Sequence, residues 1–235
     1  MDIEILFNEA CGLYGDAQNG PYLEATLPEA DFHYTKLVDT PYFAEHDPDL
    51  ILMGTMPEKI QRRVIEKLMP YRERLLELIN KGTPILATGN AGEVFAKEIH
   101  YVTEKITVPG LDFFNLTVKT DFFRRYNVKT LGKIKDFYVM GFRSQFSFLY
   151  GDNSSCCFMQ AERGIGINPE SKYEGMRKNN LMCTQLLGPI LPLNPQFCEY
   201  LISLTGHKAE AAFRSAAMDA YEQRLKEFTD PTTKF

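Results

Sequence analysis

The chain has 235 residues, of which 44% are hydrophobic and 24% are charged, so its composition is that of a globular protein and excludes a disordered or fibrous chain. Its net charge of -5 argues against a nucleic-acid-binding surface, which needs clustered lysine and arginine. No apolar run reaches the roughly 18 residues of a membrane span, and the first residues lack the pattern of a secretory signal. We therefore expect a cytoplasmic protein that binds neither nucleic acid nor a membrane.

The first half of the chain alternates strand and helix signals. Short apolar runs predict buried strands at residues 3–7, 32–38, 49–54 and 84–89. Apolar residues at helical spacing predict helices over residues 22–27, from Pro57 to Pro70, from Tyr71 to a C-terminal cap at Gly82, and over 91–99. Strands that alternate with helices form a parallel sheet covered on both faces, so we expect an α/β domain.

The second half of the chain changes character. Turns rich in Gly, Asn and Ser join short predicted strands, which indicates an antiparallel extension, at residues 134–142, 145–149, 156–160 and 181–187. Pro195 begins a further helix. A last helix is predicted to pack on the sheet through apolar residues at helical spacing: Phe213, Ala217, Tyr221, Leu225 and Phe228. We therefore expect one domain over residues 1–206, with a C-terminal helix and short tail over 207–235 packed on it.

The cysteines and histidines are not spaced as they are in metal sites or disulfide-linked domains. There are five cysteines, and their one close pair, Cys156 and Cys157, is adjacent rather than spaced for zinc. The four histidines are scattered without metal-ligand spacing. We expect reduced thiols, no metal site and no cofactor.

Two strand ends form a candidate site. Residues 85–93 run from an apolar strand through a tight glycine turn, the position at which α/β folds bind ligands. A nucleophile elbow, in which one residue takes a positive φ, has this pattern, and so does an ordinary strand-to-helix turn. At the second strand end, Cys183, Gln185 and Leu187 are predicted to share one face.

Several short blocks carry a resemblance to a known family. They read LYGDAQN at 13–19, DLILMG at 49–54, GTPILA at 82–87, GIGIN at 164–168 and GPILPLNP at 188–195. Together they resemble the class I glutamine amidotransferases, in particular the branch that includes cobyric acid synthase and the glutaminase subunit of lipid II isoglutaminyl synthase. The resemblance implies a flavodoxin-like fold, with a mostly parallel sheet flanked by helices and an antiparallel extension.

The residues that differ from the family pattern bear most on function. The resemblance implies a cysteine nucleophile at the elbow and a histidine base before the Gly-Pro turn, and these positions hold Gly89 and Leu187. The family's E-N-H cluster likewise corresponds to residues 143–145, which read RSQ. No small shift of the alignment recovers the thiol, because no cysteine lies between Cys11 and Cys156.

We therefore expect a glutamine amidotransferase-like pseudoenzyme that lacks glutaminase activity and acts as a binding or regulatory subunit. The resemblance implies a ligase or synthetase partner, and a homo-oligomer is also open. A small-molecule site is expected at Gly54, Thr88, Gly89, Asn90, Glu93, Arg143, Gln145 and Gln185. The alternative is an enzyme with altered chemistry in the same cleft, which transfers or hydrolyses amide or amino groups through Thr88, Glu93, Cys183 or Arg143.

Overall fold

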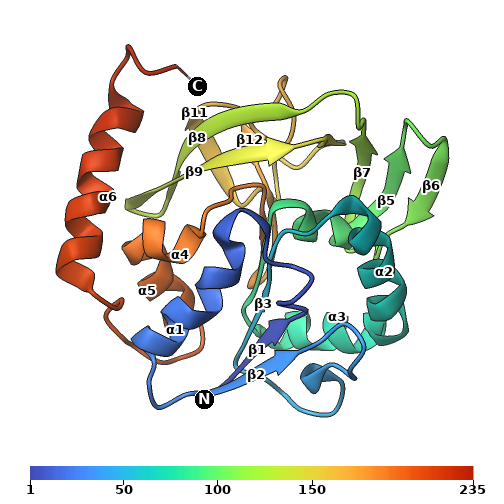
Figure 1. The fold of residues 1–235 in the computed structure, drawn as a ribbon, viewed down its shortest axis with the longest axis horizontal. Helices are drawn as coiled ribbons and strands as arrows, with labels where there is room; N and C mark the ends of the chain where they lie inside the picture. Colours follow the sequence, from blue (N-terminus) through green and yellow to red (C-terminus); the bar gives the residue numbers. More distant parts are fainter. Residues whose placement is uncertain (235) are drawn as a thin grey trace.

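The computed structural model (Figure 1) describes residues 1–234. It is built around a six-stranded sheet in the order β13-β14-β4-β3-β1-β2. Neighbouring strands are parallel except for β13, which runs antiparallel to β14 at one edge. The strands are β1 (Asp2–Leu6), β2 (Asp31–Thr35), β3 (Leu50–Met53), β4 (Ile85–Thr88), β13 (Met176–Lys178) and β14 (Leu181–Thr184). The expected mostly parallel sheet is confirmed.

Helices cover both faces of this sheet (Figure 1). One face carries α1 (Asn19–Thr26), α4 (Ile190–Leu193) and α5 (Pro195–Ser203), and the other carries α2 (Glu58–Leu68) and α3 (Arg72–Lys81). Strand alternation divides the core: Leu52 packs in the cluster of α1 and α5, whereas Ile51 and Met53 pack in the cluster of α2 and α3. No helix within residues 1–234 is long and apolar enough to cross a membrane.

The helix ends follow the signals in the sequence. Pro70 lies in a short 3-10 helix, η3 (Met69–Tyr71), which separates α2 from α3. Gly82 ends α3 with φ +90°, the left-handed cap expected there. The other connections contain the 3-10 helices η1 (Leu13–Gln18) and η2 (Tyr42–Ala44).

Two further four-stranded sheets extend the fold (Figure 1). The second is the antiparallel extension expected in the second half, whereas the first begins at Ala96, in the first half, and includes a parallel pair of strands. The first has the order β10-β7-β5-β6, with β5 (Ala96–Tyr101), β6 (Ile106–Pro109), β7 (Phe114–Thr120) and β10 (Ser147–Tyr150). The second is antiparallel throughout, with the order β12-β11-β8-β9. Its strands are β8 (Tyr126–Ile134), β9 (Phe137–Gln145), β11 (Met159–Arg163) and β12 (Tyr173–Glu174).

The helix predicted over residues 91–99 is wrong. The chain forms a short 3-10 helix, η4 (Gly89–Phe95), and then continues directly into β5. Ile99 and Tyr101 are both buried and lie two residues apart, which is the period of a strand. Strand β5 also finds hydrogen-bonding partners on both sides, in β6 and β7, so tertiary pairing overrides the short helical pattern.

Several strand boundaries were also wrong. The predicted strand at 134–142 contains instead the turn between β8 and β9, and the one at 181–187 ends at Thr184. Cys156 and Cys157, the first two residues of the strand predicted at 156–160, lie in the loop before β11. Because hairpin partners determine where these strands begin and end, the apolar runs alone misplace them.

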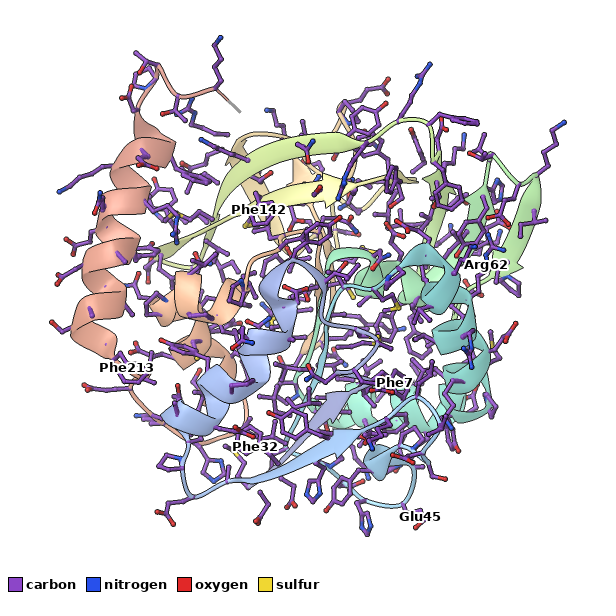
Figure 2. The ribbon with its side chains drawn as sticks, viewed as in Figure 1. Phe7, Phe32, Glu45, Arg62, Phe142 and Phe213 are labelled. Atoms are coloured by element: carbon purple, nitrogen blue, oxygen red, sulfur yellow. The ribbon has the colours of Figure 1, made fainter. Side chains whose placement is uncertain are left out.

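The C-terminal helix α6 spans Arg214–Thr229, and it packs on the antiparallel sheet rather than the central one (Figure 1). Tyr221 clusters with Leu131 and Met140, and its hydroxyl donates to the carbonyl oxygen of Tyr138 at 2.9 Å. Phe213, predicted to begin the buried face, is 78% exposed and precedes the helix with φ +54°. It lies at the edge of the molecule (Figure 2).

Candidate functional site

A small cavity lies at the carboxyl ends of the central strands, where open α/β sheets bind ligands. Its walls come from the ends of β3, β4 and β14 and from the junction of β9 with β10, and they include Thr55, Gly89, Gln145, Ser147, Gln185 and Leu187. Its volume is about 50 Å³. A cavity of this size holds about four water molecules, well short of the roughly 300 Å³ of an ordinary small-molecule site.

Gly89, in the turn after β4, has φ +56°, the positive value expected of an elbow. A β-carbon added to it would lie 2.6 Å from the β-carbon of Thr55 and 2.7 Å from Cδ2 of Leu187. Non-bonded carbon atoms attract best at about 3.5–4.0 Å, so both contacts are too close. The turn therefore has the backbone of an elbow, while Thr55 and Leu187 fill the space that a larger side chain needs.

Leu187 covers Gly89 from the β14 side and is buried. Strand β14 has already ended, and Leu187 is held instead by its N–H, which donates to the carbonyl oxygen of Phe142 at 2.9 Å. Its aliphatic side chain cannot transfer a proton. Cys183 lies deeper in β14, and burial raises the pKa of its thiol well above the ordinary value, so the thiol stays protonated.

Asp16 joins the segments that form the floor of the site. Its carboxylate accepts hydrogen bonds from the N–H of Thr55 at 3.0 Å, the hydroxyl of Thr88 at 2.6 Å and the N–H of Gly188 at 3.4 Å. Burial raises the pKa of Asp16 to about 6, although these hydrogen bonds favour its charged form. Asp16 thus fixes the ends of β3 and β4 to each other and to the segment after β14.

Asn90 clamps the turn to the chain after β3. Its Oδ1 accepts from the hydroxyl of Thr55 and from the N–H of Met56, both at 2.9 Å, and its Nδ2 donates to the carbonyl oxygen of Met56 at 2.7 Å. These bonds hold the Thr55 side chain over Gly89.

Glu93 is buried behind the cavity wall, in η4. Its Oε1 accepts from the hydroxyl of Ser147 and its Oε2 accepts from Nε2 of Gln61 at 2.8 Å. Burial is the largest influence on this carboxyl and raises its pKa to about 7. A substantial fraction of Glu93 is therefore protonated at neutral pH.

Arg143 is fully buried, and its guanidinium bonds to other parts of the protein rather than facing the cavity. Its guanidinium donates to Oε1 of Glu174 at 3.0 Å and to the carbonyl oxygen of Gly166 at 2.6 Å. Burial lowers the pKa of Arg143, and the carboxylate of Glu174 opposes that shift. Glu174 also accepts from the N–H of Gln185 at 2.8 Å, so this ion pair holds one wall of the cavity in place.

The structure separates the residues predicted to form a small-molecule site. The cavity is bordered by Gly89, Asn90, Gln145 and Gln185. A narrower crevice beside it is bordered by Gly54 and Thr88, while Glu93 and Arg143 do not border the cavity. Sequence reasoning missed Thr55 and Ser147; only the position of Thr55 directly after an apolar strand was a usable signal. Within residues 1–234, no three or more His, Cys, Asp or Glu side chains are grouped to hold a metal ion.

Comparison with known proteins gives one relative by sequence and several by fold. No family model matches the chain. The chain is 26% identical over 177 residues to subunit GatD of lipid II isoglutaminyl synthase (glutamine-hydrolyzing) from Staphylococcus aureus (strain N315), which covers 73% of this chain and 69% of that protein. A crystal structure of a glutamine amidotransferase superposes with a TM-score of 0.55 at 13% identity, over 87% of this chain and 99% of that one. A glutamine amidotransferase from Thermotoga maritima superposes with a TM-score of 0.48 at 9% identity, over 96% of this chain and 85% of that one.

Proposed function

Since this chain is a class I glutamine amidotransferase-like protein by sequence homology and by fold, we propose that it works as a subunit without glutaminase activity. In this role it binds or regulates a partner and does not release ammonia from glutamine. Any small ligand at this site meets Gly89, Asn90, Gln145 and Gln185.

The crowded turn at Gly89 carries this proposal. Thiol attack on a carboxamide needs a nucleophilic side chain at the elbow and a base within hydrogen-bond reach of it. Gly89 has no side chain, and the place for one is filled by Thr55 and Leu187. Leu187 stands where the resemblance expects the base and has no ionisable atom. On this alignment Gly89 and Leu187, which lie against each other, occupy the positions of the nucleophile and its base.

A ligase or synthetase is the proposed partner. The similar protein GatD is itself a subunit of a synthase. Tyr14 borders the cavity and is 40% accessible, while Phe123, two residues before Arg125 in the loop between β7 and β8, is 86% accessible. The guanidinium of Arg125 lies 5.5 Å from the centre of the Tyr14 ring. Exposed aromatics beside arginine are enriched in protein interfaces, which supports docking here.

A glutaminase assay tests the proposed loss of activity. The purified chain is incubated with glutamine, and the glutamate released is measured against a blank and against an active glutamine amidotransferase. We expect no glutamate above the blank. Glutamate release that Asn90→Ala abolishes would overturn the proposal, because Asn90 borders the cavity and its loss links the activity to this site.

A capture experiment tests the partner. The immobilised chain is expected to retain an ATP-dependent ligase, identified by mass spectrometry, and Phe123→Asp should release it. Phe213→Asp is the matched control, since Phe213 is similarly exposed at the far edge of the molecule (Figure 2). Equal loss in both variants, or retention in both, contradicts docking at the cavity mouth.

A further inference from the structure

We propose that Ser147 and Glu93 form a reactive pair that hydrolyses small uncharged amides, with Ser147 as the nucleophile and Glu93 as its base. The inference goes beyond the proposed function, because it concerns an oxygen nucleophile at the start of β10 and not the elbow position at Gly89. It holds whether or not the chain binds a ligase.

The contacts of Ser147 are those of an activated serine. Ser147 is 4% exposed and borders the cavity, and its hydroxyl donates to Oε1 of Glu93. A serine nucleophile needs a base in hydrogen-bond contact, and the base is usually oriented by a third group. Here Nε2 of Gln61 donates to Oε2 of Glu93 at 2.8 Å, and the hydroxyl of Tyr101 donates to Oε1 of Gln61 at 2.8 Å. Gln61 and Tyr101 therefore act as positioning residues.

The surroundings of Glu93 suit a base that works near neutral pH. Burial raises its pKa to about 7, the carboxylate of Glu58 adds to that shift, and the bonds from Ser147 and Gln61 oppose it. On the α2 side, the guanidinium of Arg62 lies 4.0 Å from the centre of the Tyr101 ring. A carboxyl of this pKa accepts a proton from the nucleophile and returns it to a leaving group.

The cavity indicates the class of substrate. Its volume of about 50 Å³ limits the substrate to a few heavy atoms. Gln145 borders it, donates from Nε2 to the carbonyl oxygen of Ser147, and has a buried Oε1 with no partner among the described residues. A buried acceptor without a partner is costly, and an amide N–H would satisfy it. Glu58, also in the wall, disfavours anionic substrates.

The reaction has two balanced steps. In the first, Oγ of Ser147 bonds to the amide carbonyl carbon and its proton passes to Glu93; the carbon–nitrogen bond then breaks, and the amine leaves with that proton. In the second, Glu93 takes a proton from water, whose oxygen bonds to the carbon of the Ser147 ester. The ester bond breaks, the carboxylic acid leaves, and the proton returns to Ser147.

Methanesulfonyl fluoride, small enough for the cavity, tests the pair. Its sulfur bonds to Oγ of Ser147, fluoride leaves and Glu93 accepts the proton. We expect an adduct on Ser147 by tandem mass spectrometry, with a labelling rate that rises about tenfold between about pH 6 and about pH 8. Glu93→Gln should lower the rate at least about tenfold. Ser203→Ala should not, since Ser203 lies in α5, does not border the cavity, and donates its hydroxyl to the carbonyl oxygen of Tyr200 at 2.6 Å.

The results that would contradict this inference differ from those that would contradict the proposed loss of glutaminase activity. An adduct only on other residues, or a rate at Ser147 that Glu93→Gln leaves unchanged, overturns the inference. If Glu93→Gln fails to fold, Ser147→Cys is treated with iodoacetamide instead. A cysteine at position 147 that stays unlabelled in folded protein means that the cavity admits no reagent, and this result also overturns the inference. Ammonia from acetamide and none from glutamine is the expected activity; no ammonia from acetamide counts against the pair, and ammonia from glutamine counts against the proposed function.

Discussion

Replacing Gly89 with alanine measures how crowded the elbow is. The added β-carbon would lie 2.5 Å from the hydroxyl oxygen of Thr55, 2.6 Å from its β-carbon and 2.7 Å from Cδ2 of Leu187. The substitution also puts an L-residue at φ +56°. Two separate costs therefore act at this position, one from the backbone and one from packing.

The two costs can be separated with a second glycine. A left-handed conformation costs a residue with a β-carbon about 1–2 kcal/mol, and overpacking a filled site costs about 1–3 kcal/mol, so Gly89→Ala should lower the free energy of unfolding by about 2–5 kcal/mol. Gly206 has φ +84° and nothing within 4 Å of its would-be β-carbon. Gly206→Ala therefore carries the backbone cost alone, about 1–2 kcal/mol.

Urea unfolding followed by circular dichroism gives the free energy of unfolding of both variants. A double-mutant cycle then tests whether the packing cost at Gly89 comes from Thr55. Thr55→Gly removes the two closest atoms, so in that background Gly89→Ala should recover about 1–3 kcal/mol of its cost. If Gly89→Ala costs no more than Gly206→Ala, or if Thr55→Gly changes nothing, then Thr55 does not fill the space over the elbow and the reasoning fails.

Three further substitutions test buried polar groups, two beside the site and one between α6 and the antiparallel sheet. The pKa of Glu93 in the folded protein, about 7, is above its ordinary 4.5, so Glu93 stabilises the fold below pH 4.5 and loses that contribution, about 3 kcal/mol, as pH rises through 7. The pKa of Asp16 is also raised, but only to about 6, so above pH 6 the further loss of stability comes mainly from Glu93. Glu93→Gln should therefore make the free energy of unfolding, measured with urea, fall less steeply above about pH 6. An unchanged dependence on pH contradicts this prediction. Arg143→Met leaves Glu174 buried without its cation and should cost about 3–5 kcal/mol by the same assay, whereas a loss below about 1 kcal/mol would show that the pair contributes little. Tyr221→Phe removes the bond to Tyr138 and should cost about 1 kcal/mol by thermal unfolding, with unchanged stability as the refuting result.

The central layer of the fold is predictable because local signals and tertiary pairing agree there. Residues 49–54 and 84–89 are apolar runs bounded by turns, and both form buried strands of the parallel sheet. Gly82 ends α3 as the sequence indicates. The segment at 91–99 fails because its strand partners, β6 and β7, lie later in the chain, and no local pattern shows them.

The site is predictable only in outline. The sequence indicates that Gly89 takes a positive φ and that the carboxyl ends of β4 and β14 meet. It does not indicate that Thr55 fills the space over Gly89, since that depends on how Asn90 holds its side chain. It also gives no signal that Ser147 meets Glu93, because 54 positions separate them and the contact forms only when β10 pairs with β7.

The bonds of Asp16 bear on the order in which the molecule is assembled. Thr88 lies 72 positions from Asp16 along the chain and Gly188 lies 172 positions from it. Contacts of such long range form late in folding, because the entropy of closing the loop must be lost first. A chain growing from the ribosome can form β1, β3 and β4 early, yet the floor of the cavity stays open until the segment around Gly188 has emerged. We expect that floor to be among the last parts to protect its amides from hydrogen exchange.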